Sequence, residues 1–168
     1  MNASIDRPRL FSHLTRTRFL HIEDSLERGK LRFFIGEFER GKGAGKVAYA
    51  FLPVESARVV LSDLADGKPV DFSDYKGGRS GDNTVISRVL KIRTKDERVW
   101  VQLQNGPGVM QEVIIKPSGR TAAEISIPLT MFEARTLGHA CLAYLRAWDV
   151  GKIVSPQRVT KEHEGDSN

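Results

Sequence analysis

Residues 98–104 decide the fold, and they have the sequence Arg-Val-Trp-Val-Gln-Leu-Gln. The alternation of apolar and polar side chains predicts a half-buried β-strand with Val99, Val101 and Leu103 facing a core. Trp100 then lies on the solvent side. A large ring gains little from folding while it stays exposed, so its position indicates a surface that holds a flat partner such as a nucleobase. The structural alternative is that a helix, a loop or another subunit covers Trp100.

Composition sets broad limits on function. A chain of 168 residues suits one domain with a sizeable core, and its net charge of +5 weakly favours a polyanionic partner. Cys141 is the only cysteine, which excludes an intramolecular disulfide, and the four His lack zinc-type spacing. We therefore expect no metal, no cofactor and no small-molecule substrate.

The chain ends and the hydropathy pattern bear on location. No stretch is apolar enough for a membrane span or a signal peptide, so we expect no membrane association and a cytoplasmic or nucleoid-associated protein. An organellar location stays open because residues 1–18 are rich in Arg, although they also contain Asp6. Residues 156–168 are predicted to form a disordered tail.

Strands followed by a helix are predicted twice along the chain. The first set comprises strands at residues 15–22, 31–39 and 47–52 and a helix that Pro53 opens. The second set comprises strands at residues 84–93, 98–104, 110–116 and 122–127 and a helix from Thr130 to about Ala147, with Thr130 and Glu133 as a capping box. The Gly- and Asp-rich residues 66–83 between the sets indicate a long polar connection.

These elements predict an α+β fold in a single domain over residues 1–155. Two repeats, of three or four strands and then a helix, cover about residues 15–66 and 84–148. Each repeat alone would bury only one face of a small sheet. We therefore expect two antiparallel sheets packed with two helices that cover their apolar faces.

Three segments carry a resemblance to a known family. They are Ser87–Ile92, Val101–Asn105 and Ile125–Thr130, the last leading to Leu145–Trp148. In this order and spacing they resemble the Whirly family of single-stranded DNA-binding proteins, most strongly over residues 84–148. The resemblance implies a ring-like homotetramer with single-stranded DNA across the sheets and between subunits.

The sequence also departs from this family. Whirly proteins usually carry a Lys-Gly-Lys-Ala motif at the start of the first strand, and this chain has none there. Residues 41–44 echo the motif only superficially, so its role is not transferred to them. Transcriptional coactivators of the positive-cofactor type and kinetoplastid guide-RNA-binding proteins share the general fold, which keeps RNA open as a partner.

Alternation in other strands places more rings beside cations. In residues 31–39, Phe34 and Phe38 share the solvent side with Arg32. Arg88 falls on the apolar side of its strand, which a bulge or a subunit contact would explain. The predicted nucleic-acid-binding residues are Arg32, Phe34, Phe38, Lys42, Lys46, Lys91, Arg93, Arg98, Trp100 and Gln102.

The glycine-rich residues 41–46 are not a nucleotide-hydrolysis loop. Arg40 stands where a Walker motif needs its first Gly, and Val47 stands where it needs Ser or Thr. The segment is predicted to be a hairpin loop, with contact to backbone phosphates as the functional alternative.

The predicted function is sequence-tolerant binding of single-stranded DNA through stacking and Lys/Arg contacts to phosphates. The alternatives are an RNA-binding protein of the same fold and a non-catalytic oligomeric module whose exposed rings are protein interfaces. Catalysis is not expected, because no acid, base and nucleophile occur together and Cys141 lies on the apolar stripe of a helix.

Overall fold

Each half of the chain folds into an antiparallel sheet followed by a helix. The computed structural model describes residues 6–155, and the tail predicted at residues 156–168 lies outside them. The first sheet has the strand order β1 (Arg9–Leu14), β2 (Arg18–Ser25), β3 (Lys30–Glu39) and β4 (Gly43–Pro53), with a short 3-10 helix at Leu26–Arg28. Helix α1 (Val54–Ala65) follows.

The second sheet contains the remaining strands. They are β5 (Asp71–Arg79), β6 (Val85–Lys95), β7 (Arg98–Gln111), β8 (Ile114–Pro117) and β9 (Ala123–Thr130). The order is β5-β6-β7-β8, and β9 pairs with β7 along residues 98–105. Helix α2 (Met131–Val154) ends the described chain, and its first turn has the predicted capping box between Thr130 and Glu133. The α+β fold with two antiparallel sheets and two helices is therefore confirmed.

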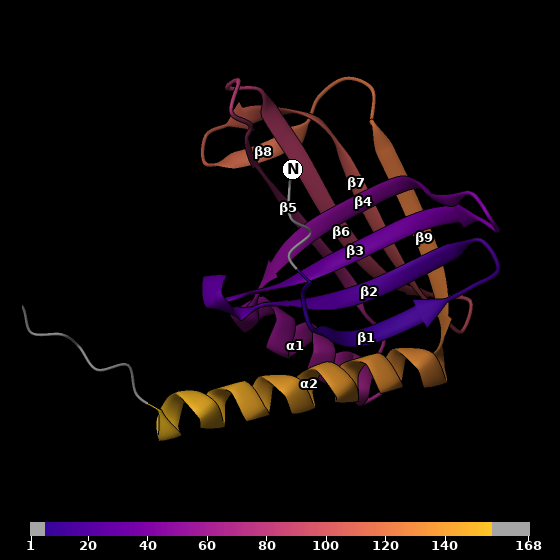
Figure 1. Cartoon of the computed structure of the whole chain (residues 1–168), viewed down its shortest axis with the longest axis vertical. Coiled ribbons are helices and arrows are strands. Elements are labelled where there is room, and N and C mark those ends of the chain that lie inside the picture. The colour runs from indigo at the N-terminus through magenta and orange to yellow at the C-terminus, as the bar shows by residue number, and fades with distance from the viewer. Residues whose placement is uncertain (1–5, 156–168) are drawn as a thin grey trace, which may run out of the picture.

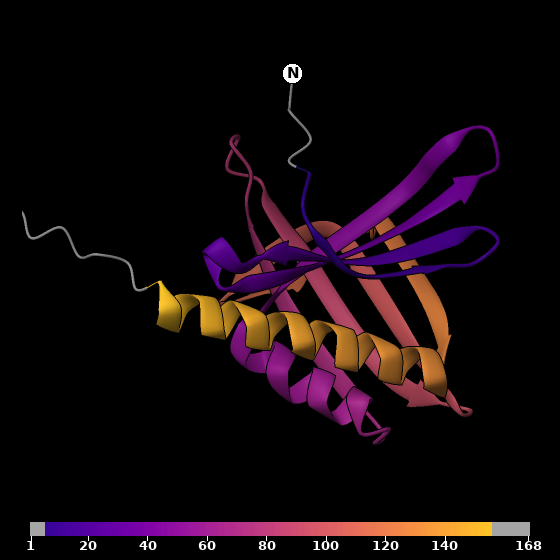
Figure 2. The same cartoon turned by 60° about the horizontal axis from the view of Figure 1, so that its bottom comes forward.

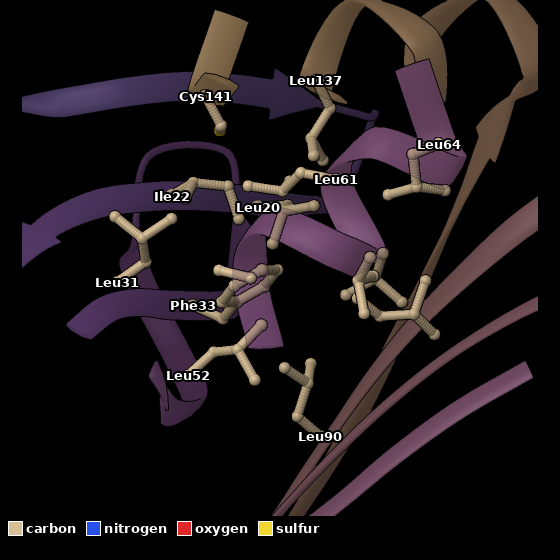
Figure 3. Packing of buried hydrophobic residues seen from close by; sticks show 14 of the residues in the cluster. Leu20, Ile22, Leu31, Phe33, Leu52, Leu61, Leu64, Leu90, Leu137 and Cys141 are labelled. Atoms are coloured by element: carbon tan, nitrogen blue, oxygen red, sulfur yellow. The ribbon is translucent and has the colours of Figure 1, made fainter. Parts of the chain in front are cut away.

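One hydrophobic core takes the apolar faces of both sheets. The strands of the two sheets cross, and α1 and α2 lie side by side against them (Figures 1 and 2). Figure 3 shows Leu20, Phe33 and Leu52 of the first sheet meeting Leu61 of α1 and Leu137 of α2, and all five are buried. Val99, Val101 and Leu103 are fully buried, as their alternation predicts.

Two side chains of the second sheet hold the edge of the first. The Asn105 amide donates to the Tyr49 carbonyl at 2.8 Å and accepts from the Tyr49 backbone N–H at 2.9 Å. Arg88 donates a hydrogen bond to the hydroxyl of the same residue, Tyr49 of β4. The strand pairing of β6 is regular through Arg88, which faces Lys76 and Asn105, so the predicted bulge is wrong. Arg88 lies on the apolar side because it links the two sheets within one chain.

Several predicted boundaries are wrong. Residues 66–83 contain β5, and residues 105–108 continue β7 instead of forming a turn. Gly77 and Gly78 fall in the predicted connection but lie in β5, where a Cβ added to Gly77 would clash with the Ile86 carbonyl oxygen of β6 and come within 2.9 Å of Ile115 Cγ2 of β8. Strand β1 precedes the first predicted strand, and α2 runs on to Val154.

Candidate nucleic-acid interface

The outer face of the first sheet is covered with aromatic rings. Alternation along β2, β3 and β4 sends the aliphatic residues inward and leaves the rings on the other side. We call this surface the aromatic face, and it comprises Phe19, His21, Phe34, Phe38, Tyr49 and Phe51. The Phe19 ring is stacked on His21 at 4.7 Å and meets Phe34 edge-on at 5.3 Å. The rings of Phe19, His21, Phe34 and Phe38 form one cluster, and those of Tyr49 and Phe51 form a second.

Guanidinium groups lie among these rings. The Arg32 guanidinium is 4.4 Å from the centre of the Phe34 ring and 4.9 Å from that of Tyr49. Arg32 Nη1 also donates to Glu23 Oε2 at 2.6 Å, so part of its charge is neutralised within the sheet. Arg88 places a second guanidinium 4.8 Å from Tyr49. Such surfaces combine π-faces with positive charge, as binding of bases and phosphates requires.

His21 belongs to the aromatic face as an uncharged ring. It is 8% exposed, and its Nδ1 is hydrogen-bonded to the Ser12 hydroxyl at 2.8 Å. Burial lowers the pKa of His21 below its usual 6.5, and the positive charge of Arg9 lowers it further. At neutral pH the imidazole therefore supports the Phe19 ring without adding charge.

A groove lies where the two hairpins of the first sheet end. The β1–β2 and β3–β4 hairpins splay apart toward their turns (Figure 2). The groove measures about 590 Å³, and its lining includes Arg18, Phe38, Lys42 and Lys46. Lys42 Nζ lies 2.6 Å from a carboxylate oxygen of Glu39. The β3–β4 pairing has a bulge next to Phe38. The groove thus joins one ring of the aromatic face to several cations.

The outer face of the second sheet carries the other predicted residues. We call it the tryptophan face, and it comprises Lys91, Arg93, Arg98, Trp100 and Gln102. Trp100 is 36% exposed and stands between Arg93 of β6 and Pro128 of β9. Two of its polar neighbours are already engaged. Arg93 Nε donates to Asp71 at 2.9 Å, and the Gln102 amide donates to Glu124.

The two faces point in different directions. Both sheets turn their apolar sides into one core, so their outer sides face away from each other. The predicted residues therefore form two groups: Arg32, Phe34 and Phe38 with Lys42 and Lys46 on the first sheet, and the tryptophan face on the second. Within residues 6–155 no single flat platform unites the two groups.

The arrangement of two crossed antiparallel sheets, each followed by a helix, matches a solved structure. The crystal structure of WHY1 from Arabidopsis thaliana superposes with a TM-score of 0.51 and 13% sequence identity, over 98% of this chain and 99% of that chain. The chain has the Whirly fold. No protein-family model matches the sequence, and no curated protein matches it at a significant level.

Within the Whirly fold, the sequence predictions missed four members of the aromatic face. Phe19 and His21 alternate with Leu20 and Ile22 on β2, and Tyr49 and Phe51 alternate with alanines and Leu52 on β4. The alternation that places Phe34 on the solvent side of β3 also places these four side chains on the outer face of the sheet. Lys46 lies in β4 and not in the predicted hairpin loop, because the turn spans only residues 40–42.

Cys141 is fully buried, and burial raises its pKa to about 12, so its thiolate is not formed at neutral pH. Over residues 6–155 no three His, Cys, Asp or Glu side chains gather as metal ligands would. Neither α1 nor α2, the α-helices of this part of the chain, is long and apolar enough to cross a membrane.

Proposed function

We propose that this protein binds single-stranded DNA with little sequence preference. One observation carries the proposal: both sheets bury their apolar faces in a common core and still carry aromatic rings beside cations on their outer faces. Rings stack on any base, at about 1 to 3 kcal/mol per base, and cations add salt-dependent contacts with phosphates. The Whirly fold agrees with this function.

A strand that is already unpaired suits these faces better than duplex does. The bases of a duplex are stacked on one another and present only their edges in the grooves. The rings of the aromatic face and Trp100 need exposed base faces. We therefore expect single strands to bind more tightly than duplex of equal length.

We also propose that the chain forms a homotetramer through α2. Phe132 is 79% exposed, and Val150, Ile153 and Val154 are exposed on the same helix. Phe132 and Val150 are 18 residues apart, which is five helical turns, so they share one side of α2. Contact with further copies of the chain would bury this side. Light scattering of wild type and of Phe132→Glu tests this, with a smaller assembly expected for the variant and an unchanged mass contradicting it.

The proposed role is non-catalytic, and its test is a competition titration. Unlabelled single-stranded DNA, RNA and duplex of one sequence compete with a labelled DNA strand at two salt concentrations. We expect single-stranded DNA to compete best and its affinity to fall steeply with salt. Equal competition by duplex would contradict the proposal, and stronger competition by RNA would identify RNA as the ligand. Absence of binding by the folded assembly would favour a protein-interaction module.

A further inference from the structure

We propose that Tyr75 forms a second base-stacking site on the tryptophan face, in line with Trp100 and beside Lys116 of β8. This inference rests on the proposed function and extends it to a segment, β5, that carries no residue in the predicted site. It assigns a path to the bound strand across the second sheet.

The strand register places Tyr75 and Trp100 on the same side of the sheet. Tyr75 pairs with Val89 of β6, and Trp100 pairs with Arg93 of the same strand. Lys91 lies between these two positions and points the same way, because residues two apart on a strand share a face. Trp100, Lys91 and Tyr75 therefore lie on a diagonal across β7, β6 and β5, which run side by side in Figure 1.

Tyr75 lies at the rim of a hollow that a base could enter. The hollow measures about 550 Å³ and lies between β5 and β8, with Asp74, Tyr75, Ile114 and Lys116 as its lining. Tyr75 is 43% exposed, and Ile114 offers an exposed apolar side chain next to it. The Asp74 carboxylate lies 3.2 Å from Lys76 Nζ, which offsets its negative charge toward a phosphate.

The rings of this diagonal differ from those of the aromatic face. Phe34 and Phe19 already contact each other edge-on, and Tyr49 contacts Phe51. Among the described residues, neither Tyr75 nor Trp100 lies against another ring. Both can therefore offer a ring face to a base.

The spacing of the two rings fixes the length of strand that engages both. Arg93 and Val89, their partners on β6, are four residues apart, and β5 and β7 are two strand spacings apart, which together give roughly 16 Å. At about 3.4 Å per step this distance corresponds to about five steps, or about six nucleotides, and to fewer in an extended strand. An oligonucleotide of eight reaches both rings, and one of three reaches a single ring.

Oligo(dT) of three and of eight nucleotides therefore tests the inference with the full chain. Tyr75→Ala should weaken binding of the longer strand by about 5- to 150-fold, the loss of one stacked base. It should weaken the shorter strand by about twofold, because Trp100 remains available. Tyr75→Phe keeps the ring and should bind as wild type does. Val59→Ala, an exposed position on α1, is the matched control and should leave both affinities unchanged.

Lys116→Gln provides an independent readout if Tyr75→Ala alters the fold. It should lower the slope of log affinity against log salt by about 0.7 for the longer strand, and by less for the shorter strand, part of which binds at Trp100. If wild type binds neither strand, the proposed function fails and this inference with it. If wild type binds and Trp100→Ala weakens binding, but Tyr75→Ala and Lys116→Gln match wild type with the longer strand, the second site alone is refuted.

Discussion

Arg88 Nη2 donates a hydrogen bond of 3.0 Å to the Tyr49 hydroxyl while the guanidinium of the same residue lies 4.8 Å from the Tyr49 ring centre. The two residues come from different sheets, so one side chain engages both the polar and the aromatic part of its partner. This relationship fixes Tyr49 within the aromatic face. It also explains why a cation occupies the apolar side of β6.

Tyr49→Phe should lower the free energy of unfolding by about 1 to 3 kcal/mol. The ring stays in place, but the half-buried guanidinium loses its acceptor. Chemical denaturation measures the change. Tyr75→Phe removes an exposed hydroxyl and serves as the control, with no change expected. Equal stability of Tyr49→Phe and wild type would show that the hydrogen bond does not hold the sheets together.

The two tryptophans should respond differently to alanine. Trp100→Ala should weaken binding of single-stranded DNA by about 5- to 150-fold with little change in melting temperature, because its ring is exposed. Trp148 packs against the core, and the centre of its ring lies 4.2 Å from Lys152 Nζ. Because these contacts are lost, Trp148→Ala should destabilise the fold by about 3 kcal/mol. Binding titrations and thermal melts separate the two. The reverse pattern would overturn the assignment of Trp100 to a binding face.

Lys91→Gln should reduce the salt dependence of DNA binding. Loss of one phosphate contact lowers the slope of log affinity against log salt by about 0.7 for a single strand. Lys68→Gln removes the same charge at the end of α1, where Lys68 Nζ lies 3.2 Å from Asp66, and should leave the slope unchanged. Titrations at several salt concentrations measure both. Equal slopes for Lys91→Gln and wild type would place Lys91 outside the phosphate path.

Gly138 is required where α2 crosses α1. An added Cβ would lie 2.6 Å from both the Leu61 carbonyl oxygen and the Ala65 nitrogen, so Gly138→Ala should destabilise the fold by about 1 to 3 kcal/mol. Gly151→Ala, on the same helix, meets no atom within 4 Å and should stabilise it by up to about 1 kcal/mol. Thermal unfolding of both variants checks the contrast. A stabilising Gly138→Ala would contradict this close approach.

His21 should make the protein less stable in mild acid. Its pKa is lower in the folded state than in the unfolded chain, so the unfolded state takes up more protons below about pH 6.5. The stability due to the neutral ring is complete above that pH and is lost as the pH falls toward the lower, folded pKa. Between pH 7 and pH 5, the melting temperature of His21→Gln should fall by less than that of wild type. Equal falls in the melting temperatures of both proteins would show that other titratable groups dominate the pH dependence.

Local patterns in the sequence were sufficient to predict which residues form the interior of the fold. Val99, Val101 and Leu103 are buried where alternation predicts them, and Thr130 caps α2 as predicted. Strand β5 could not be found this way, because Gly77 serves close contacts with β6 and β8 that no local pattern records. The same limit applies to the site: alternation gives each residue its face, but the crossing of the sheets separates Phe34 from Trp100.

The Asn105 side chain covers part of the edge of the first sheet, where backbone groups of β4 would otherwise be exposed. A sheet edge with free N–H and C=O groups invites a strand from another molecule, which is a common route to aggregation. The Asn105 amide supplies both a donor and an acceptor to Tyr49, as a peptide group of an adjacent strand would. At this point β4 therefore has no free peptide group for a foreign strand, and one side chain protects the middle of the edge from fibril-like growth.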